Sequence, residues 1–157
     1  MAANETLQEG VDGMPKEALD VVLAVIVHPG RRHCLLSKRP EGVHLAGHWE
    51  FPGGKVGLTE GLQAALTREV REELGLVVST ADSRLFNSLN HSYPERDVCL
   101  HTYLVEGVAS EAYLPLGEDG VGSEGQLTRW VAFSRLGDYD FPAANAPIVA
   151  ALKRNRW

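Results

Sequence analysis

The chain has 157 residues, of which 44% are apolar and 23% charged, and its formal net charge is −6. This length supports one compact domain with a core and leaves little for a second. An acidic chain lacks the basic face that binding to a nucleic-acid backbone requires, so we expect no nucleic-acid polymer as a partner. A nucleotide remains a possible ligand, because a bound divalent cation changes the local sign of the charge.

The sequence has no feature of a membrane or secreted protein. No stretch approaches the roughly 18 apolar residues that span a membrane, and the polar, acidic start of the chain is unlike a signal peptide. Two cysteines, Cys34 and Cys99, are too few for a disulfide framework. We therefore expect a cytoplasmic protein. We also expect a monomer or weak homodimer, with residues 1–18 as a flexible tail and residues 19–157 as a single domain.

Apolar runs bounded by turn residues predict the strands in chain order. Such runs occupy residues 21–27, 34–37, 49–51, 84–89, 98–105 and 128–133. The polar and glycine-containing segments 40–48 and 115–126 are expected to be loops. Most of the apolar patterning in the chain is therefore of the strand type.

Two segments are predicted to be helices. In the first, residues 59–74, one apolar stripe repeats every four residues, at Leu62, Leu66, Val70 and Leu74. Thr59 is its expected N-cap and Gly75 the residue that follows its end. A second helix should begin near Ala146 or Pro147, with Asn145 as its N-cap. The order of strands, helix, strands and helix predicts an α+β domain, an α/β/α sandwich with a mixed β-sheet flanked by helices.

The first helix carries three carboxylates close together on one face. Glu69, Glu72 and Glu73 are spaced i, i+3 and i+4, and Glu72 and Glu73 lie in the last turn, where the helix dipole disfavours anions. A solvated helix face is the structural alternative for such a stretch. A hard divalent cation with oxygen ligands would offset the repulsion, and an adjacent Gly53-Gly54 turn allows the backbone to approach a ligand.

A longer pattern surrounds these carboxylates. Gly54 is followed after five residues by Glu60 and after seven more by the run Arg68-Glu69-Val70-Arg71-Glu72-Glu73-Leu74-Gly75-Leu76. This 23-residue segment resembles a complete Nudix box, with no position departing from the pattern. The resemblance implies an α/β/α Nudix fold and hydrolysis of a nucleoside diphosphate linked to another group, with Mg²⁺ as the cofactor and Mn²⁺ as a possible substitute.

The resemblance also implies roles for individual residues. Glu69, Glu72 and Glu73 resemble the metal-binding carboxylates, and the carbonyl of Gly53 or Gly54 is a further candidate ligand. Arg68 resembles the arginine that orients Glu69, and it could also pair with Glu72 at i+4.

Two box residues have simpler alternatives. Glu60 matches an acid of the box, but a favourable charge at the helix N-terminus would equally explain it. Lys55 is a candidate phosphate contact or an exposed lysine after a turn.

Three further stretches resemble the MutT-type branch, which hydrolyses nucleoside triphosphates and favours 8-oxo-dGTP. They are Trp49-Glu50-Phe51-Pro52-Gly53-Gly54-Lys55, Tyr93-Pro94-Glu95-Arg96, and Phe141-Pro142-Ala143-Ala144-Asn145 with the residues that follow up to Arg154. The resemblance implies that Asn145 reads the purine edge, because an amide offers a donor and an acceptor. Glu124 aligns with a loop acid that adds a metal ligand. The remaining expected substrate contacts are Arg39, Phe51, Tyr93 and Arg96.

This resemblance implies the reaction NTP plus water to NMP plus diphosphate, with Glu69 first and Glu124 second as candidate general bases. Alternatives within the superfamily are CTP or other pyrimidine triphosphates, dinucleoside polyphosphates and ADP-ribose. A catalytically silent nucleotide-binding domain is a different class, but such domains usually lose box carboxylates, and this chain retains them all.

Overall fold

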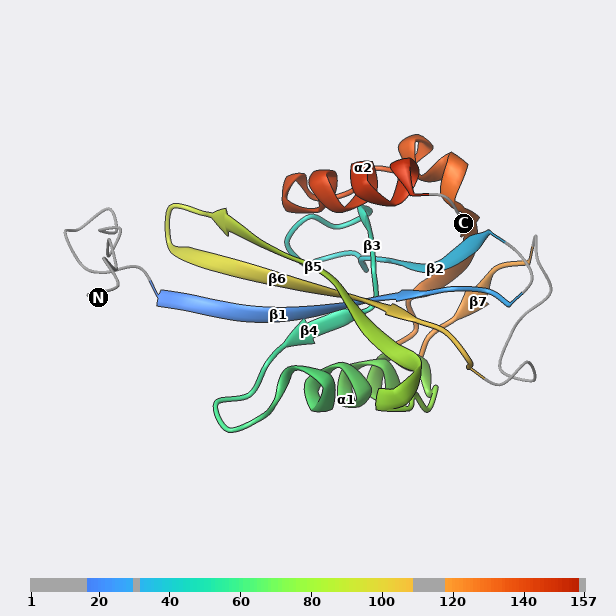
Figure 1. Cartoon of the computed structure of the whole chain (residues 1–157). Coiled ribbons are helices and arrows are strands. Elements are labelled where there is room, and N and C mark those ends of the chain that lie inside the picture. The colour runs from blue at the N-terminus through green and yellow to red at the C-terminus, as the bar shows by residue number, and fades with distance from the viewer. Residues whose placement is uncertain (1–16, 30–31, 109–117, 156–157) are drawn as a thin grey trace.

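The computed structural model describes residues 17–29, 32–108 and 118–155. Two helices, α1 (Leu62–Leu74) and α2 (Ala146–Arg154), lie on opposite sides of the β-strands, which gives the expected α/β/α layering (Figure 1). No helix in these described ranges is long and apolar enough to cross a membrane. The mixed α+β class predicted from the sequence is confirmed.

The strands form two four-stranded sheets where the sequence had indicated one mixed sheet. The first has the order β4-β1-β6-β5, and the second has the order β3-β2-β8-β7. Their bounds are β1 Glu17–Ile26, β2 His33–Lys38, β3 Trp49–Glu50, β4 Gly53–Lys55, β5 Ser83–Ser92, β6 Arg96–Val105, β7 Gly120–Val121 and β8 Leu127–Ala132. Only the β1–β6 pair is parallel, so the first sheet is the mixed one. An isolated bridge between Val27 and Cys34 links the two sheets.

Long-range pairing extends several strands beyond their apolar runs. β1 begins at Glu17, so residues 17 and 18 belong to the sheet and not to the predicted tail, while residues 1–16 lie outside the described part. β5 and β6 leave only a three-residue turn at 93–95. β4 and β7 were missed, because their glycines show no strand pattern. Residues 115–117 of the predicted loop 115–126 also lie outside the described residues.

Helix α1 covers one face of the first sheet. Its buried residues Ala65, Leu66 and Val70 pack with Val22 and other alternate residues of β1. Gly75 follows its end with φ 68°, a left-handed conformation that suits glycine, as expected. The predicted start was wrong, because the helix begins at Leu62 after Gly61. Thr59 and Glu60 instead lie in a turn in which the Glu60 N–H donates to the Gly57 carbonyl over 3.1 Å.

Candidate active site

The carboxylates of α1 face the start of β4, which follows the short turn after β3. The N–H of Gly53 donates to Glu73 Oε2 over 3.3 Å, and the side chain of Glu69 is only 14% exposed. A Cβ added at Gly54 would lie 2.5–2.6 Å from the Glu69 carboxylate, so a larger residue here would displace that carboxylate from its present position. The Gly53-Gly54 pair, expected to form a turn, lies instead in strand β4, and the backbone of this strand is what approaches the acidic helix.

Arg68 connects four of the groups around this turn. Its Nε and one terminal nitrogen each donate to Glu60 over 2.8 Å. Another terminal nitrogen reaches Glu69 at 2.9 Å and Glu72 at 3.3 Å, and a further bond of 3.0 Å goes to the Lys55 carbonyl. Arg68 thus holds Glu69 in place, and the i,i+4 contact with Glu72 is present.

Glu60 does not lie in the first turn of α1, where its charge was expected to favour the helix N-terminus. Its carboxylate accepts two bonds from Arg68 and a third, of 3.0 Å, from the Gly57 N–H. The Arg68 bonds, followed by the Gly57 bond, lower the pKa of Glu60 from 4.5 to about 2. Glu60 therefore stays ionised and acts as an anchor for Arg68.

Glu73 lies in an electrostatically unfavourable place. Burial, and then the charges of Glu50, Glu69 and Glu124, raise its pKa from 4.5 to about 8, against the opposing effect of the Gly53 N–H bond. Glu50 also has a raised pKa, chiefly from burial, although Arg39 donates to it over 2.8 Å. Four carboxylates from α1, β3 and the β7–β8 turn therefore influence one another here, and such crowding of like charge favours a cation.

The raised pKa of Glu73 predicts a pH-dependent stability of the metal-free protein. Because the folded state holds this proton up to about pH 8 and the unfolded chain only to about 4.5, the stabilisation is complete below pH 4.5. It is lost as pH rises toward 8. We expect Glu73→Gln to flatten the pH profile of Tm in this window and to raise Tm at pH 8 by a few degrees, at about 2–4 °C per kcal/mol.

The measurement is thermal unfolding in the presence of a chelator, with Glu106→Gln as the matched control. Glu106 is an exposed acid that follows β6, where its ion pair with Arg84 is 3.9 Å long. If the Tm of the parent protein falls no more steeply with rising pH than the Tm of Glu73→Gln, the raised pKa assigned to Glu73 is wrong.

The turn between β7 and β8 brings Glu124 to α1. Gln126 is buried, its Nε2 donates to the Glu73 carbonyl over 3.0 Å, and its Oε1 accepts from the Glu124 N–H at the same distance. The Ser123 N–H also donates to the Glu73 carbonyl, over 2.8 Å. Sequence reasoning missed Gln126, which gave no pattern; its amide is what ties the Glu124 turn to the end of α1.

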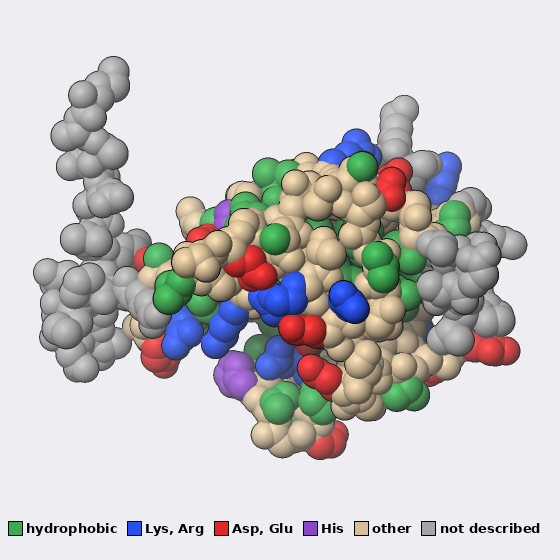
Figure 2. Space-filling model, turned by 90° about the horizontal axis from the view of Figure 1, so that it is seen from below, with side chains coloured by type: hydrophobic (Ala, Val, Ile, Leu, Met, Phe, Trp, Pro, Cys, Tyr) green, Lys and Arg blue, Asp and Glu red, His purple; other side chains and the backbone are tan. Residues whose placement is uncertain are grey.

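These groups fit a hard divalent metal by their chemistry. All of the candidate ligands offer oxygen, as Mg²⁺ and Mn²⁺ prefer. The carboxylates of Glu69, Glu72 and Glu73 do not form a group of three ligand atoms within 4.8 Å in the described residues. The Glu72 side chain is 56% exposed and turned toward Arg68, as expected for like charges that separate without a counterion. Seen from the α1 side, acidic and basic side chains lie next to each other in the middle of the surface (Figure 2).

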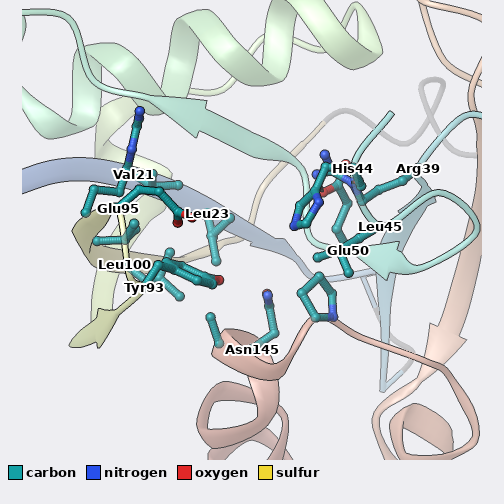
Figure 3. A pocket seen from close by; sticks show the side chains of 14 residues that line it. Val21, Leu23, Arg39, His44, Leu45, Glu50, Tyr93, Glu95, Leu100 and Asn145 are labelled. Atoms are coloured by element: carbon teal, nitrogen blue, oxygen red, sulfur yellow. Dashed lines mark hydrogen bonds and ion pairs between the residues drawn. The ribbon is translucent and has the colours of Figure 1, made fainter. Parts of the chain in front are cut away.

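A pocket of about 350 Å³ lies on the other face of the first sheet. β1 and β6 contribute apolar residues such as Leu23 and Leu100, the 39–50 segment closes one side, and the segment before α2 closes another (Figure 3). Four predicted substrate contacts meet here: Arg39, Tyr93, Arg96 and Asn145. Its volume and its mainly apolar lining with a few polar groups are typical of small-molecule sites.

Glu50 links this pocket to the carboxylates of α1. It lines the pocket, and its charge contributes to the raised pKa of Glu73. Sequence reasoning also missed His44, Leu45 and Glu95 in the lining. Leu45 has φ 59°, a left-handed conformation that is unusual for a side chain of this kind and is often found at functional sites.

Asn145 occupies the N-cap position of α2 but makes no capping hydrogen bond. Its side chain is buried, and the nitrogen end of its amide points into the pocket (Figure 3), while its Oδ1 is buried without a hydrogen-bond partner in the described structure. A buried amide without a partner is costly, at roughly 1–3 kcal/mol. Because the amide neither caps the helix nor finds another partner, the capping alternative is the weaker explanation of this residue.

Two of the six predicted substrate contacts do not line the pocket. Phe51 is 2% exposed and stacks on Phe141 with ring centroids 5.2 Å apart, so it supports the pocket from the core. Lys55 is exposed on β4, where its backbone pairs with Val21, a pocket residue. Its backbone carbonyl accepts a bond from Arg68, so Lys55 lies near the carboxylates of α1. A contact between Lys55 and a phosphate stays a prediction.

The layered fold and its carboxylate-bearing helix define a hydrolase of the divalent-metal class. A family model described as NUDIX domain matches residues 22–151, and the chain belongs to this family. It is 33% identical to an 8-oxo-dGTP diphosphatase of Escherichia coli over 82% of this chain and 92% of that protein. A Haemophilus influenzae 8-oxo-dGTP diphosphatase is 36% identical over 74% and 79% of the two chains.

A solved structure agrees with this assignment. A structure described as MutT from Aliivibrio salmonicida and Vibrio cholerae superposes with a TM-score of 0.71 and 28% identity, covering 87% of this chain and 98% of that one. Nudix hydrolases generally depend on a divalent metal. The family expected from the 23-residue box is therefore confirmed.

Proposed function

We propose that this Nudix hydrolase converts nucleoside triphosphates to the monophosphate and diphosphate and that it prefers 8-oxo-dGTP. Asn145 carries the choice of substrate, because its buried amide lines the pocket and its oxygen has no hydrogen-bond partner among the described residues. The oxidised base differs from guanine at N7, which bears a hydrogen in 8-oxoguanine and is a bare acceptor in guanine. An amide oxygen accepts from the first and repels the second.

The carboxylates of α1 and the β7–β8 turn suit the phosphate chain. We infer that Glu69, Glu72, Glu73, Glu124 and the Gly53 carbonyl hold Mg²⁺, with Mn²⁺ as a substitute. When bound, the metal would neutralise phosphate charge and make a coordinated water more acidic. The identity of the metal and this ligand set are part of the proposal.

The remaining steps belong to the side chains. Glu69 takes the proton of the attacking water, since its carboxylate is nearly buried and held by Arg68 at 2.9 Å. Glu124 is the second candidate base, and Gln126 keeps its turn against α1. Arg39 and Arg96 supply positive charge at the pocket, where the triphosphate would enter. Tyr93 offers an aromatic face to the base.

A second candidate function comes from another relative. A CTP pyrophosphohydrolase of Escherichia coli is 44% identical over 64 residues, which is 41% of this chain and 46% of that protein. This match covers less than half of either chain, and it offers no separate account of the unpartnered Asn145 amide. Hydrolysis of CTP is therefore the alternative that the assay must separate.

The test is a panel of 8-oxo-dGTP, dGTP, CTP, ADP-ribose and a dinucleoside polyphosphate. Each is assayed with Mg²⁺, with Mn²⁺ and with a chelator, and released diphosphate is measured separately from orthophosphate. We expect the highest kcat/KM for 8-oxo-dGTP, diphosphate as the product, and no turnover with the chelator. Faster hydrolysis of CTP would favour the alternative. Tight binding of nucleotides without any hydrolysis would indicate a silent binding domain.

A further inference from the structure

A second group of metal-ligating side chains lies away from the carboxylates of α1. Asp20 on β1 and Cys99 and His101 on β6 each present one ligand atom, and these three atoms all lie within 4.8 Å of one another. Asp20 and Cys99 are paired neighbours in the parallel β1–β6 ladder, and Cys99 and His101 are two residues apart on one face. The sheet itself therefore fixes the cluster.

This cluster is separate from the nucleotide pocket. Val21, Val98 and Leu100 alternate with the cluster residues along β1 and β6, and they line the pocket on the opposite face of the sheet. On the cluster's own face, α1 packs further along β1, against Val22 and its neighbours. Neither the box nor the proposed nucleotide chemistry uses Asp20, Cys99 or His101.

We propose that Asp20, Cys99 and His101 bind a thiophilic divalent cation, Zn²⁺, with water as a fourth ligand. A thiolate and an imidazole select zinc over Mg²⁺, which prefers oxygen alone. Three protein ligands leave one position open, and the side chain of Asp20 is 59% exposed while that of His101 is 13% exposed. The ion would thus be held against the sheet and reached from one side.

The separation of Asp20 and His101 suits tetrahedral zinc after a small movement. The Nε2 of His101 and Oδ1 of Asp20 are 2.9 Å apart, and the same atoms on one zinc would be about 3.3 Å apart, given metal–ligand distances of about 2.0–2.2 Å. The zinc would therefore replace the hydrogen bond between these two atoms. The backbone carbonyl of Asp20 accepts a 3.0 Å hydrogen bond from the Val56 N–H. This bond holds the backbone of β1 in place, so the adjustment falls to the side chains.

Ser88 on β5 supplies the outer contact that zinc-binding histidines usually have. Its Oγ lies 2.8 Å from His101 Nδ1, across the antiparallel β5–β6 pair. An ionised Asp20 can only accept, so without metal a neutral His101 would carry its proton on Nε2, and Nδ1 would accept from the serine hydroxyl. With metal on Nε2, the proton moves to Nδ1 and the hydroxyl becomes the acceptor. A hydroxyl can serve both states, which a carboxylate or an ammonium group could not.

The test uses the full chain freed of metal, with Co²⁺ as a spectroscopic substitute for Zn²⁺ and excess Mg²⁺ present to occupy oxygen-only sites. We expect one equivalent of Co²⁺ to give a thiolate-to-cobalt absorption band that Zn²⁺ displaces. Cys99→Ser and His101→Gln should abolish the band, and Ser88→Ala should weaken Zn²⁺ binding by about 10- to 100-fold. His91→Gln, on β5 outside the cluster, is the matched control and should retain it.

A second measurement needs no variant. Zn²⁺, but not Mg²⁺, should slow alkylation of Cys99 in the unaltered protein, while the buried Cys34 is a slow internal reference. A band that survives Cys99→Ser, or Cys99 alkylation that is indifferent to Zn²⁺, would overturn the proposal and leave Ser88, His101 and Asp20 as a hydrogen-bonded chain only. Turnover by Cys99→Ser with Mg²⁺ should match that of the parent, so the proposed nucleotide activity is judged separately.

Discussion

Glu69→Gln is expected to lower kcat by about 10²- to 10⁴-fold, the range found for loss of a general base, while the protein remains folded. The glutamine keeps the size of the side chain and can still meet Arg68, which now contacts Glu69 at 2.9 Å. It cannot take a proton from water, and it removes a negative ligand from the proposed Mg²⁺ site. The measurement is kcat with 8-oxo-dGTP at saturating Mg²⁺, together with Tm.

The control for this variant is again Glu106→Gln, an exposed acid whose loss should leave kcat unchanged. A Mg²⁺ titration separates the two roles of Glu69. Rescue of kcat by high Mg²⁺ would mean that the residue chiefly binds metal, whereas an unrescued loss supports proton transfer. Near-parent turnover at ordinary Mg²⁺ would remove Glu69 from both roles and make Glu124 the leading candidate.

Asn145→Ala is expected to lower kcat/KM for 8-oxo-dGTP by about 10- to 100-fold, with a smaller effect on dGTP. Leaving a buried donor of the bound base without its acceptor costs roughly 1–3 kcal/mol. The Asn145 oxygen has no partner within the described protein, so its loss disturbs no internal bond. The measurement is the ratio of kcat/KM for the two nucleotides, with the Mg²⁺ dependence recorded in parallel.

Asn90→Ala is a suitable control, because Asn90 is exposed on β5. An equal loss for 8-oxo-dGTP, dGTP and CTP would show that Asn145 shapes the pocket without reading the base. A lower Tm for Asn145→Ala would show instead that Asn145 stabilises the start of α2, even though it makes no capping bond.

The sequence predicted the first helix more accurately than the strands of the sheets. The end of α1 at Gly75 and its buried stripe followed from local rules, because a four-residue repeat and a left-handed glycine act within one segment. Its start was misplaced because Glu60 bonds to Arg68, eight residues away, in preference to the turn of a longer helix. β4 was missed because its partner, β1, lies about 30 residues earlier in the chain, and β7 because its two residues, Gly120 and Val121, are too few to show a strand pattern.

The site shows the same division. The box predicted Glu69, Glu72 and Glu73 together, since neighbours on a helix face are set by spacing alone. Arg39, Tyr93, Arg96 and Asn145 line one pocket in the fold, and their contact with a substrate stays a prediction that rests on the resemblance. Phe51 was placed among the substrate contacts, and in the fold it packs on Phe141 in the core, because the residue that follows β3 turns inward like Trp49, two positions earlier.

By itself the sequence determined the family, the carboxylate helix and the chemistry that those carboxylates permit, because a motif of fixed spacing on one helix needs no distant partner to be read. Only the tertiary structure determined which residues from other segments lie close to this helix and to the pocket. It brought Glu50 and the Gln126-held turn of Glu124 to Glu73, left the Asn145 oxygen without a partner, and set Asp20 beside Cys99 and His101. These contacts join residues far apart in the chain, and strand register, which is set by global packing, determines which of them meet.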